Sequence, residues 1–395
     1  MPLPLIALFI AAFAFGTTEF VVAGVLPQVA EGLGVTIPQA GYLVTGYAVG
    51  IAVGGPLMTV ATARVSRRSL LIALAIVFTA GQVACALAPG FASMLALRVA
   101  VAVAHGVFFG VAMVVAVGLV PPQKRGMAVA FVLAGLTVSN IVGVPAGTAI
   151  GALFGWRMTF WAMFALGVLA TIAMIALLPR VGGPAARPSG LGREIGVLAR
   201  QQVWTSLIMM LMLMMAQFIP FTYIAPMLSE VTGNAPDRIP LVLLLNGIGA
   251  TVGVFLGGRL AGGRLMQGLI GLFLLQSLVM AAMWVLSPLP LPMVAVVTVW
   301  GLVSFAIGTP IQARILAWTA DAPNLAASLI PSGFNIGIAI AASIGAMLLE
   351  GGFGYRSLPL IGVVSMALAA AVALGSLAAE RRSGARPPVG AVSGG

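Results

Sequence analysis

Acidic side chains, histidine and cysteine are all scarce in this chain. Its 395 residues include 8 Asp and Glu, 1 His and 1 Cys, and only 7% are charged, whereas a soluble domain is about 25% charged. A single cysteine, Cys85, excludes an internal disulfide framework and gives no metal cluster. A chain so poor in polar side chains cannot cover itself with a surface suited to water, so we expect lipid to be its solvent.

Apolar residues take the place of the missing polar ones, at 61% of the chain. A helix needs about 20 of them in succession to cross a bilayer. Twelve such runs occur, which predicts an all-α integral membrane fold with runs at 4–26, 39–62, 69–88, 93–119, 127–150, 158–178, 203–228, 239–261, 268–287, 290–316, 325–349 and 358–379. The first run lacks a basic flank and a convincing cleavage site, so we interpret it as a retained helix.

Basic residues predict the orientation of these helices. With the N-terminus in the cytoplasm, three basic residues fall outside, Arg98 falls within a span, and fifteen fall inside: Arg64, Arg67, Arg68, Lys124, Arg125, Arg180, Arg187, Arg193, Arg200, Arg259, Arg264, Arg314, Arg381, Arg382 and Arg386. This positive-inside bias predicts a multi-pass protein of the cell membrane with both termini cytoplasmic. It also accounts for the net charge of +11 without a nucleic-acid partner.

The chain repeats itself at an offset near 200 residues. "PQVAE" ends at Glu31 and "PMLSE" at Glu230, and "GWR" at 155–157 recurs as "GYR" at 354–356. We therefore predict a six-helix bundle over 1–178, a Pro- and Gly-rich cytoplasmic linker over 179–202, a second bundle over 203–379, and a disordered cytoplasmic tail over 380–395. Parallel six-span repeats are typical of transporters that bind substrate between the two halves.

Glycines recur at four-residue spacing in the second span of each half, at Gly46, Gly50, Gly54 and Gly55 and again at Gly249, Gly253 and Gly257. Such a face lets a neighbouring helix approach closely. Simple packing is one interpretation, and sliding of helices during transport is the other.

Three segments carry a family resemblance: "GTTEFVVAGVLPQVAEGLGV" in the first span and loop, "HGVFFGVA" at 105–112 and "FNIGIAIAASIGA" at 334–346. They resemble the major facilitator superfamily, and more narrowly its twelve-span drug:proton antiporters of the sugar-, purine- and chloramphenicol-efflux branch. The resemblance implies two six-helix bundles, alternating access, a small-molecule substrate, protons as the driving force, no cofactor and a monomer in the lipid bilayer.

Two family motifs are altered. The loop after the second span keeps Arg64, Arg67 and Arg68 but has Ala63 where the family has an Asp, and Gly262 stands near the matching position of the second half. The charge latch of the family is thereby in doubt. The antiporter motif of the fifth span keeps Gly143, Pro145 and Gly147 in a shifted spacing, and we expect its kink and close packing to survive.

Glu19 is the one acidic residue that falls deep within a predicted span. An ionised residue there costs about 2.5–3.5 kcal/mol on insertion scales, and protonation lowers that cost. A carboxyl that ionises when water reaches it can carry protons. The structural alternative is a protonated side chain that donates one hydrogen bond to a neighbouring helix.

Two further ionisable residues, Arg98 and His105, lie seven residues apart and hence two turns apart on one face of the fourth span. Glu19 falls between them in depth. The resemblance places the first and fourth spans along the central cavity, so the three side chains are candidates for proton coupling. The alternatives are snorkelling of Arg98 to the headgroups and a packing role for His105.

Polar residues within spans are candidates for the substrate cavity, although many such side chains only join helix to helix. They are Thr17, Thr18, Tyr47, Asn140, Gln217, Tyr223, Asn246, Gln312 and Asn335. The function that we expect is proton-coupled export of a small organic compound, such as a drug, sugar or nucleoside. Proton-coupled import remains open, and an integral-membrane enzyme is disfavoured because the chain offers no convincing catalytic constellation.

Overall fold

The computed structural model describes residues 2–62, 64–179, 196–260 and 264–384. Twelve helical segments within these residues are long and apolar enough to cross a membrane, which confirms the predicted all-α membrane fold. The chain divides into two compact units. One comprises Met1–Arg187, Thr222–Ser229 and Asn234–Leu244, and the other Pro188–Phe221, Glu230–Gly233 and Leu245–Gly395. The domain limits drawn from the sequence stay a prediction.

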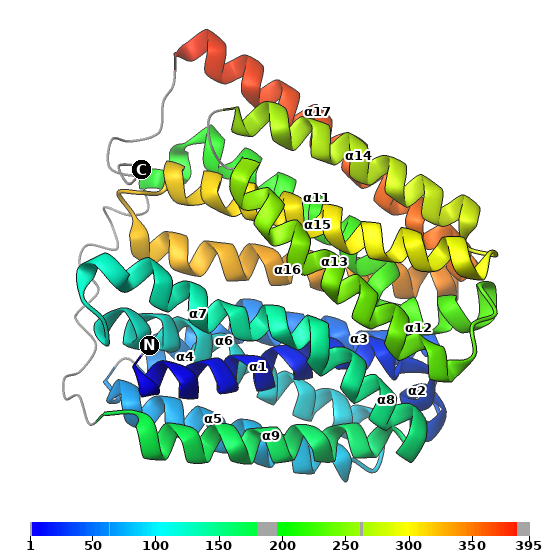
Figure 1. The fold of residues 1–395 in the computed structure, drawn as a ribbon, viewed down its shortest axis with the longest axis horizontal. Coiled ribbons are helices and arrows are strands. Elements are labelled where there is room, and N and C mark those ends of the chain that lie inside the picture. Colours follow the sequence, from blue (N-terminus) through cyan, green and yellow to red (C-terminus); the bar gives the residue numbers. More distant parts are fainter. Residues whose placement is uncertain (1, 63, 180–195, 261–263, 385–395) are drawn as a thin grey trace. The chain divides into compact units, whose positions relative to one another are not determined.

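The first six spans contain nine α-helices and two π-helical segments, with a short 3-10 turn between them (Figure 1). These are α1 (Leu3–Gly24), α2 (Leu26–Leu33), α3 (Ile37–Val49), η1 (Gly50–Gly54), α4 (Gly55–Ala61), α5 (Arg67–Ala86), α6 (Phe91–Gly118), η2 (Pro122–Lys124), α7 (Arg125–Val138), η3 (Ser139–Gly143), α8 (Val144–Phe154) and α9 (Trp156–Leu177). Helix α1 packs against α7, α8 and α9, and α6 packs against α3 and α5.

The last six spans follow the same plan. Their elements are η4 (Gly196–Ala199), α11 (Gln201–Thr222), α12 (Ile224–Pro226), η5 (Met227–Val231), η6 (Pro236–Arg238), α13 (Ile239–Leu260), α14 (Leu265–Leu286), α15 (Pro290–Trp318), α16 (Pro323–Glu350), η7 (Tyr355–Ser357) and α17 (Leu358–Ser383). Helix α14 packs along α17 and α15, and α14 and α17 run side by side in Figure 1.

Two spans are interrupted by π-helical turns that directly precede a proline. Segment η1 precedes Pro56 in the second span, and η3 precedes Pro145 in the fifth. A proline lacks the N–H of a regular helix and clashes with the carbonyl four residues earlier, and a wider turn relieves this conflict. The irregularity expected at the antiporter motif is thus a π turn, and the second span carries one that the sequence analysis did not anticipate.

The glycine faces are tight helix contacts in both halves. Gly50 lies against Ala102 and the carbonyl of Val99 on α6. In the second half, Gly253 lies against the carbonyl of Leu302 on α15. The antiporter motif packs in the same way, because Gly143 lies against Thr17 of α1. Small residues therefore bring the second span close to the fourth in each half, as the repeat predicts.

The repeated "GWR" and "GYR" segments also make equivalent contacts. The guanidinium of Arg157 donates to the carbonyl of Ala88 at 3.1 Å, just after the third span. Arg356 donates to the carbonyl of Trp284 at 3.1 Å, near the end of the ninth span. Each arginine thus binds a carbonyl at or just beyond the end of the corresponding helix, where carbonyls lack a complete set of intrahelical partners.

One arginine of the altered loop motif has a clear structural role. Arg68 donates from Nε to the carbonyl of Leu178 and from Nη2 to that of Ile175, both at 2.8 Å, and so caps the end of α9. Arg64 is exposed and Arg67 half-buried. Ala63 and Gly262 lie outside the described residues, as do residues 180–195 of the predicted linker over 179–202.

The last helix is longer than the sequence analysis predicts. Helix α17 continues to Ser383, so residues 380–383, which we assigned to a disordered tail, are helical. The reason is a buried contact of Glu380, described below. The predicted tail from residue 385 onward lies outside the described residues.

Candidate functional site

Glu19 lies near the end of α1, five residues before Gly24, with only 10% of its side chain exposed. Its Oε2 is 3.8 Å from Nε2 of His105 on α6. This separation is within the range of an ion pair and longer than a hydrogen bond. The first and fourth spans thus bring an acid and a base together inside one bundle.

His105 is held from its other side by Tyr47 of α3. The Tyr47 hydroxyl is 3.0 Å from Nδ1 of His105, which is hydrogen-bonding distance. The aromatic rings of Phe15 and Phe109 flank the imidazole, with centroids 5.3 Å and 5.0 Å from it. The imidazole therefore meets a phenol at one nitrogen and a carboxyl at the other, with apolar rings around it.

Arg98 completes the cluster two turns before His105 on α6. Its side chain is buried, so it points into the bundle rather than to the headgroups. Nη1 donates to the carbonyl of Thr18 at 2.8 Å, and Cζ lies 4.1 Å above the Tyr47 ring, a cation–π contact. Nε and Nη2 have no hydrogen-bond partner within the described part of the chain. Arg98 therefore keeps unused donors within electrostatic reach of Glu19.

These four side chains form what we call the Glu19 cluster: Glu19, Tyr47, Arg98 and His105. An ionised Glu19 balances the charge of Arg98, and a protonated Glu19 leaves one net positive charge in an apolar interior. One proton thus changes the charge of a buried site, which is the chemistry that ion coupling requires. The coupling role of Glu19, Arg98 and His105 itself stays a prediction.

Two of the other three polar candidates of the first half, Thr17 and Asn140, form hydrogen bonds within their own helices. The Thr17 hydroxyl donates to the carbonyl of Phe13 at 2.7 Å, and Asn140 donates to that of Leu136 at 3.1 Å. Thr18 is fully buried beside Arg98, and its hydroxyl has no partner among the residues that the structure describes. Helix-to-helix packing therefore accounts for Thr17, and contact with a substrate stays a prediction for all three.

The candidates of the second half are scattered. Asn246 donates to the carbonyl of Val297 at 2.8 Å, and Asn335 to that of Pro331 at 3.1 Å. Gln217 is buried, whereas Gln312 is exposed. Tyr223 is buried within the first unit, where its hydroxyl lies next to Gly41. The role of these five residues toward a substrate stays a prediction.

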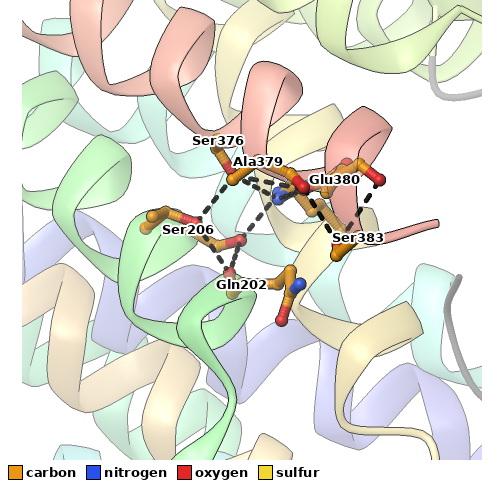
Figure 2. Close-up of polar contacts among 8 residues, drawn as sticks. Gln202, Ser206, Ser376, Ala379, Glu380 and Ser383 are labelled. Carbon is orange, nitrogen blue, oxygen red and sulfur yellow. Dashed lines mark hydrogen bonds and ion pairs between the residues drawn. The ribbon is translucent and has the colours of Figure 1, made fainter. Parts of the chain in front are cut away.

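A second buried charge pair lies in the second unit, and the sequence analysis missed it. The guanidinium of Arg314, near the end of α15, pairs with Glu380 of α17. Its Nε also donates to Ser206 Oγ of α11 at 3.0 Å, and Nη2 to Ser376 Oγ at 2.9 Å. Figure 2 shows Ser206, Ser376 and Glu380 turned toward one another. The sequence carries two signals for this network: Arg314 falls inside the predicted span 290–316, and Ser376 and Glu380 are one helical turn apart.

Neutral side chains form further hydrogen bonds with both members of this second pair. Ser376 donates to the Glu380 carboxylate at 3.1 Å, so both members of the pair have neutral hydrogen-bond partners as well. Close to it, Arg200 forms a bidentate pair with Asp321 at 2.7 and 2.6 Å, but there the two side chains are 30% and 47% exposed. The Arg314 network ties α11, α15 and α17 together and has a structural role. No group of three or more metal-ligating side chains occurs in the described ranges.

Comparison with known proteins gives consistent matches over nearly the whole chain. Residues 8–316 match the Major Facilitator Superfamily. The chain is 40% identical over 366 residues to the inner membrane transport protein YdhP of Escherichia coli strain K12, which is 93% of this chain and 94% of that protein. It is 34% identical to the chloramphenicol resistance protein of Streptomyces lividans, over 88% of this chain and 90% of the relative.

A solved structure is similar in fold. It is that of a bacterial homologue of the human lysosomal transporter Spinster, at a TM-score of 0.74 and 18% identity, over 95% of this chain and 96% of that one. This likeness supports the two-bundle architecture with its parallel repeat.

Proposed function

The chain belongs to the major facilitator superfamily of membrane transporters, and from this premise we propose that it exports a small organic compound in exchange for protons. The observation that carries the proposal is the pair of Glu19 and His105, 3.8 Å apart in the interior of the first bundle. A buried acid beside a base is energetically costly in a membrane protein, so its presence points to a role in transport.

In the proposed cycle, Glu19 takes a proton from outside as the compound leaves. It releases the proton inside, and the ionised carboxylate then permits the next compound to bind. Arg98 stabilises the ionised form through its charge, and His105 presents a polar group to the carboxyl in either form. The membrane potential supplies about 2.3 kcal/mol per charge per 100 mV, and the pH gradient adds to it.

The name of one relative favours export over import as the direction of transport. The Streptomyces protein is named for resistance to chloramphenicol, and removal of the drug from the cell is one way in which a membrane transporter confers resistance. Export of drug-like compounds is accordingly the direction that we propose, and accumulation inside the cell would identify a proton-coupled importer instead.

The test is to replace Glu19→Gln, which keeps the size of the side chain but removes its exchangeable charge. A susceptibility screen in an efflux-deficient host that includes chloramphenicol first selects a transported compound. Flux of that compound and internal pH are then followed in vesicles with an imposed pH gradient. We expect the variant to insert normally, because a neutral amide costs less in the span than a carboxylate, and to lose uphill transport.

Glu31→Gln is the matched control, since Glu31 is exposed at the end of the first span's loop helix α2. It should transport and move protons as the wild type does. Uphill transport with normal proton movement in the Glu19→Gln variant would show that Glu19 is structural, and coupling would then have to be sought first at His105.

A further inference from the structure

We infer that Tyr47 is a positioning residue of the proton site: its hydroxyl donates to Nδ1 of His105 and holds the imidazole in the tautomer that carries its proton on Nε2, facing Glu19. Tyr47 was a candidate for the substrate cavity, but it is only 1% exposed. The inference rests on the proposed role of Glu19, and it adds what fixes the tautomer of the neighbouring His105.

The imidazole of His105 has little freedom. Phe15 and Phe109 enclose its ring, and Tyr47 stands edge-on to it with centroids 5.7 Å apart. Within the described residues, its two nitrogens meet one polar side chain each, Tyr47 at Nδ1 and Glu19 at Nε2. In a neutral imidazole one nitrogen is a donor and the other an acceptor, so the two contacts are linked through the ring.

The charges around the ring decide which nitrogen carries the proton. A carboxylate at Nε2 favours an N–H on that side, because the N–H dipole then points at the negative charge. Nδ1 is then an acceptor, and the Tyr47 hydroxyl must donate to it. Arg98 strengthens this arrangement, because its cation lies over the phenol ring and favours donation by the hydroxyl.

The titratable and charged groups that surround the pair are few. Glu19 reaches it from α1, Tyr47 from α3, Cys85 from α5 and Arg98 from α6 itself. Cys85 is buried and carries no charge as a thiol. The pH response of the ring is therefore set mainly by Glu19, Arg98 and Tyr47. Through the ring, the Tyr47 hydroxyl favours the ionised form of Glu19.

The chain allows a direct test because His105 is its single histidine. Protein labelled with nitrogen-15 histidine gives one imidazole in an NMR spectrum, and the shifts of its two nitrogens report the tautomer. At a pH high enough to ionise Glu19, we expect the wild type to carry the proton on Nε2. In Tyr47→Phe, which keeps the ring under Arg98 and removes only the hydroxyl, the ratio of the Nε2–H to the Nδ1–H form should fall roughly five- to tenfold.

Tyr42→Phe is the matched control, because it removes a hydroxyl from the same helix at a half-buried position. It should leave the spectrum unchanged. A wild-type proton on Nδ1 would overturn the inference, and so would an unaltered ratio in Tyr47→Phe. If Tyr47→Phe does not fold, the tautomer measured in the wild type is the test of the inference.

The vesicle assay separates this inference from the proposed function. Loss of the hydroxyl removes a donor that favours ionised Glu19, so the pH of half-maximal transport in Tyr47→Phe should move upward by up to about one unit, with no shift in Tyr42→Phe. An unshifted profile contradicts the inference alone. A wild-type protein that moves no protons contradicts the proposed function, whereas the tautomer result would still stand.

Discussion

Arg314 allows a quantitative prediction, because its side chain is 4% exposed and that of its partner Glu380 is 16% exposed. Replacing Arg314→Met keeps the apolar stem and removes the cation. The Glu380 carboxylate then retains only Ser376 as a hydrogen-bond partner among the contacts that we describe. Breaking a buried pair typically costs about 3–5 kcal/mol, and partial access to water reduces this, so we expect about 2–4 kcal/mol of lost stability.

A double-mutant cycle with Arg314→Met and Glu380→Gln isolates the pair itself. The free energy of unfolding in detergent is measured by denaturant titration for the wild type, the two single variants and the double variant. Because hydrogen bonds to charged groups are worth about 1.5–3 kcal/mol, we expect a coupling energy of about 2 kcal/mol. A coupling below about 0.5 kcal/mol would refute our view that this network holds α11, α15 and α17 together.

Arg200 and Asp321 provide the control pair, since exposure to water should limit their coupling to about 1 kcal/mol despite the bidentate geometry. The hydrogen bond from Arg200 holds the pKa of Asp321 below its usual value of 3.8. A lowered pKa in the folded state means that this small contribution is present at neutral pH. It is lost as the pH falls through the folded pKa, so the stability difference between wild type and Asp321→Asn should vanish in strong acid.

Two further predictions concern helix packing and orientation. Gly253→Leu should abolish transport or lower the amount of folded protein, because a side chain there would press on the carbonyl of Leu302, whereas Gly258→Leu should be tolerated because the space around Gly258 is open. The measurements for both variants are the amount of folded protein and the transport per folded molecule. A normal amount of fully active Gly253→Leu protein would contradict the close contact. A reporter active only in the cytoplasm should be active when fused within 183–192 or after Ser383, and an inactive fusion at either place, with the protein present, would contradict the charge-based orientation.

The spans and the internal repeat could be predicted from the sequence because they depend on local properties. Length and hydropathy fix where a helix can cross lipid, and the spacing of Gly46, Gly50 and Gly54 fixes which face can approach another helix. Predicted and observed spans agree to within a few residues, except that the seventh ends at Thr222 rather than at 228 and the last continues past Glu380 to Ser383. Counting along the first and fourth spans predicted Glu19 between Arg98 and His105 in depth, and the structure brings His105 to Glu19 and Arg98 to the neighbouring Thr18.

The partners of these side chains were decided by tertiary structure. Sequence spacing places Arg98 and His105 on one face of α6, but the rotation and tilt of α1 and α3 determine what that face meets. Tyr47 could not be distinguished from other polar residues until packing brought its hydroxyl to His105 and its ring to Arg98. For the same reason Arg314 and Glu380, 66 residues apart, were counted only as a basic residue on the cytoplasmic side and as part of the tail. Hydropathy is summed along the chain, whereas a buried polar contact depends on the three-dimensional fit of several helices.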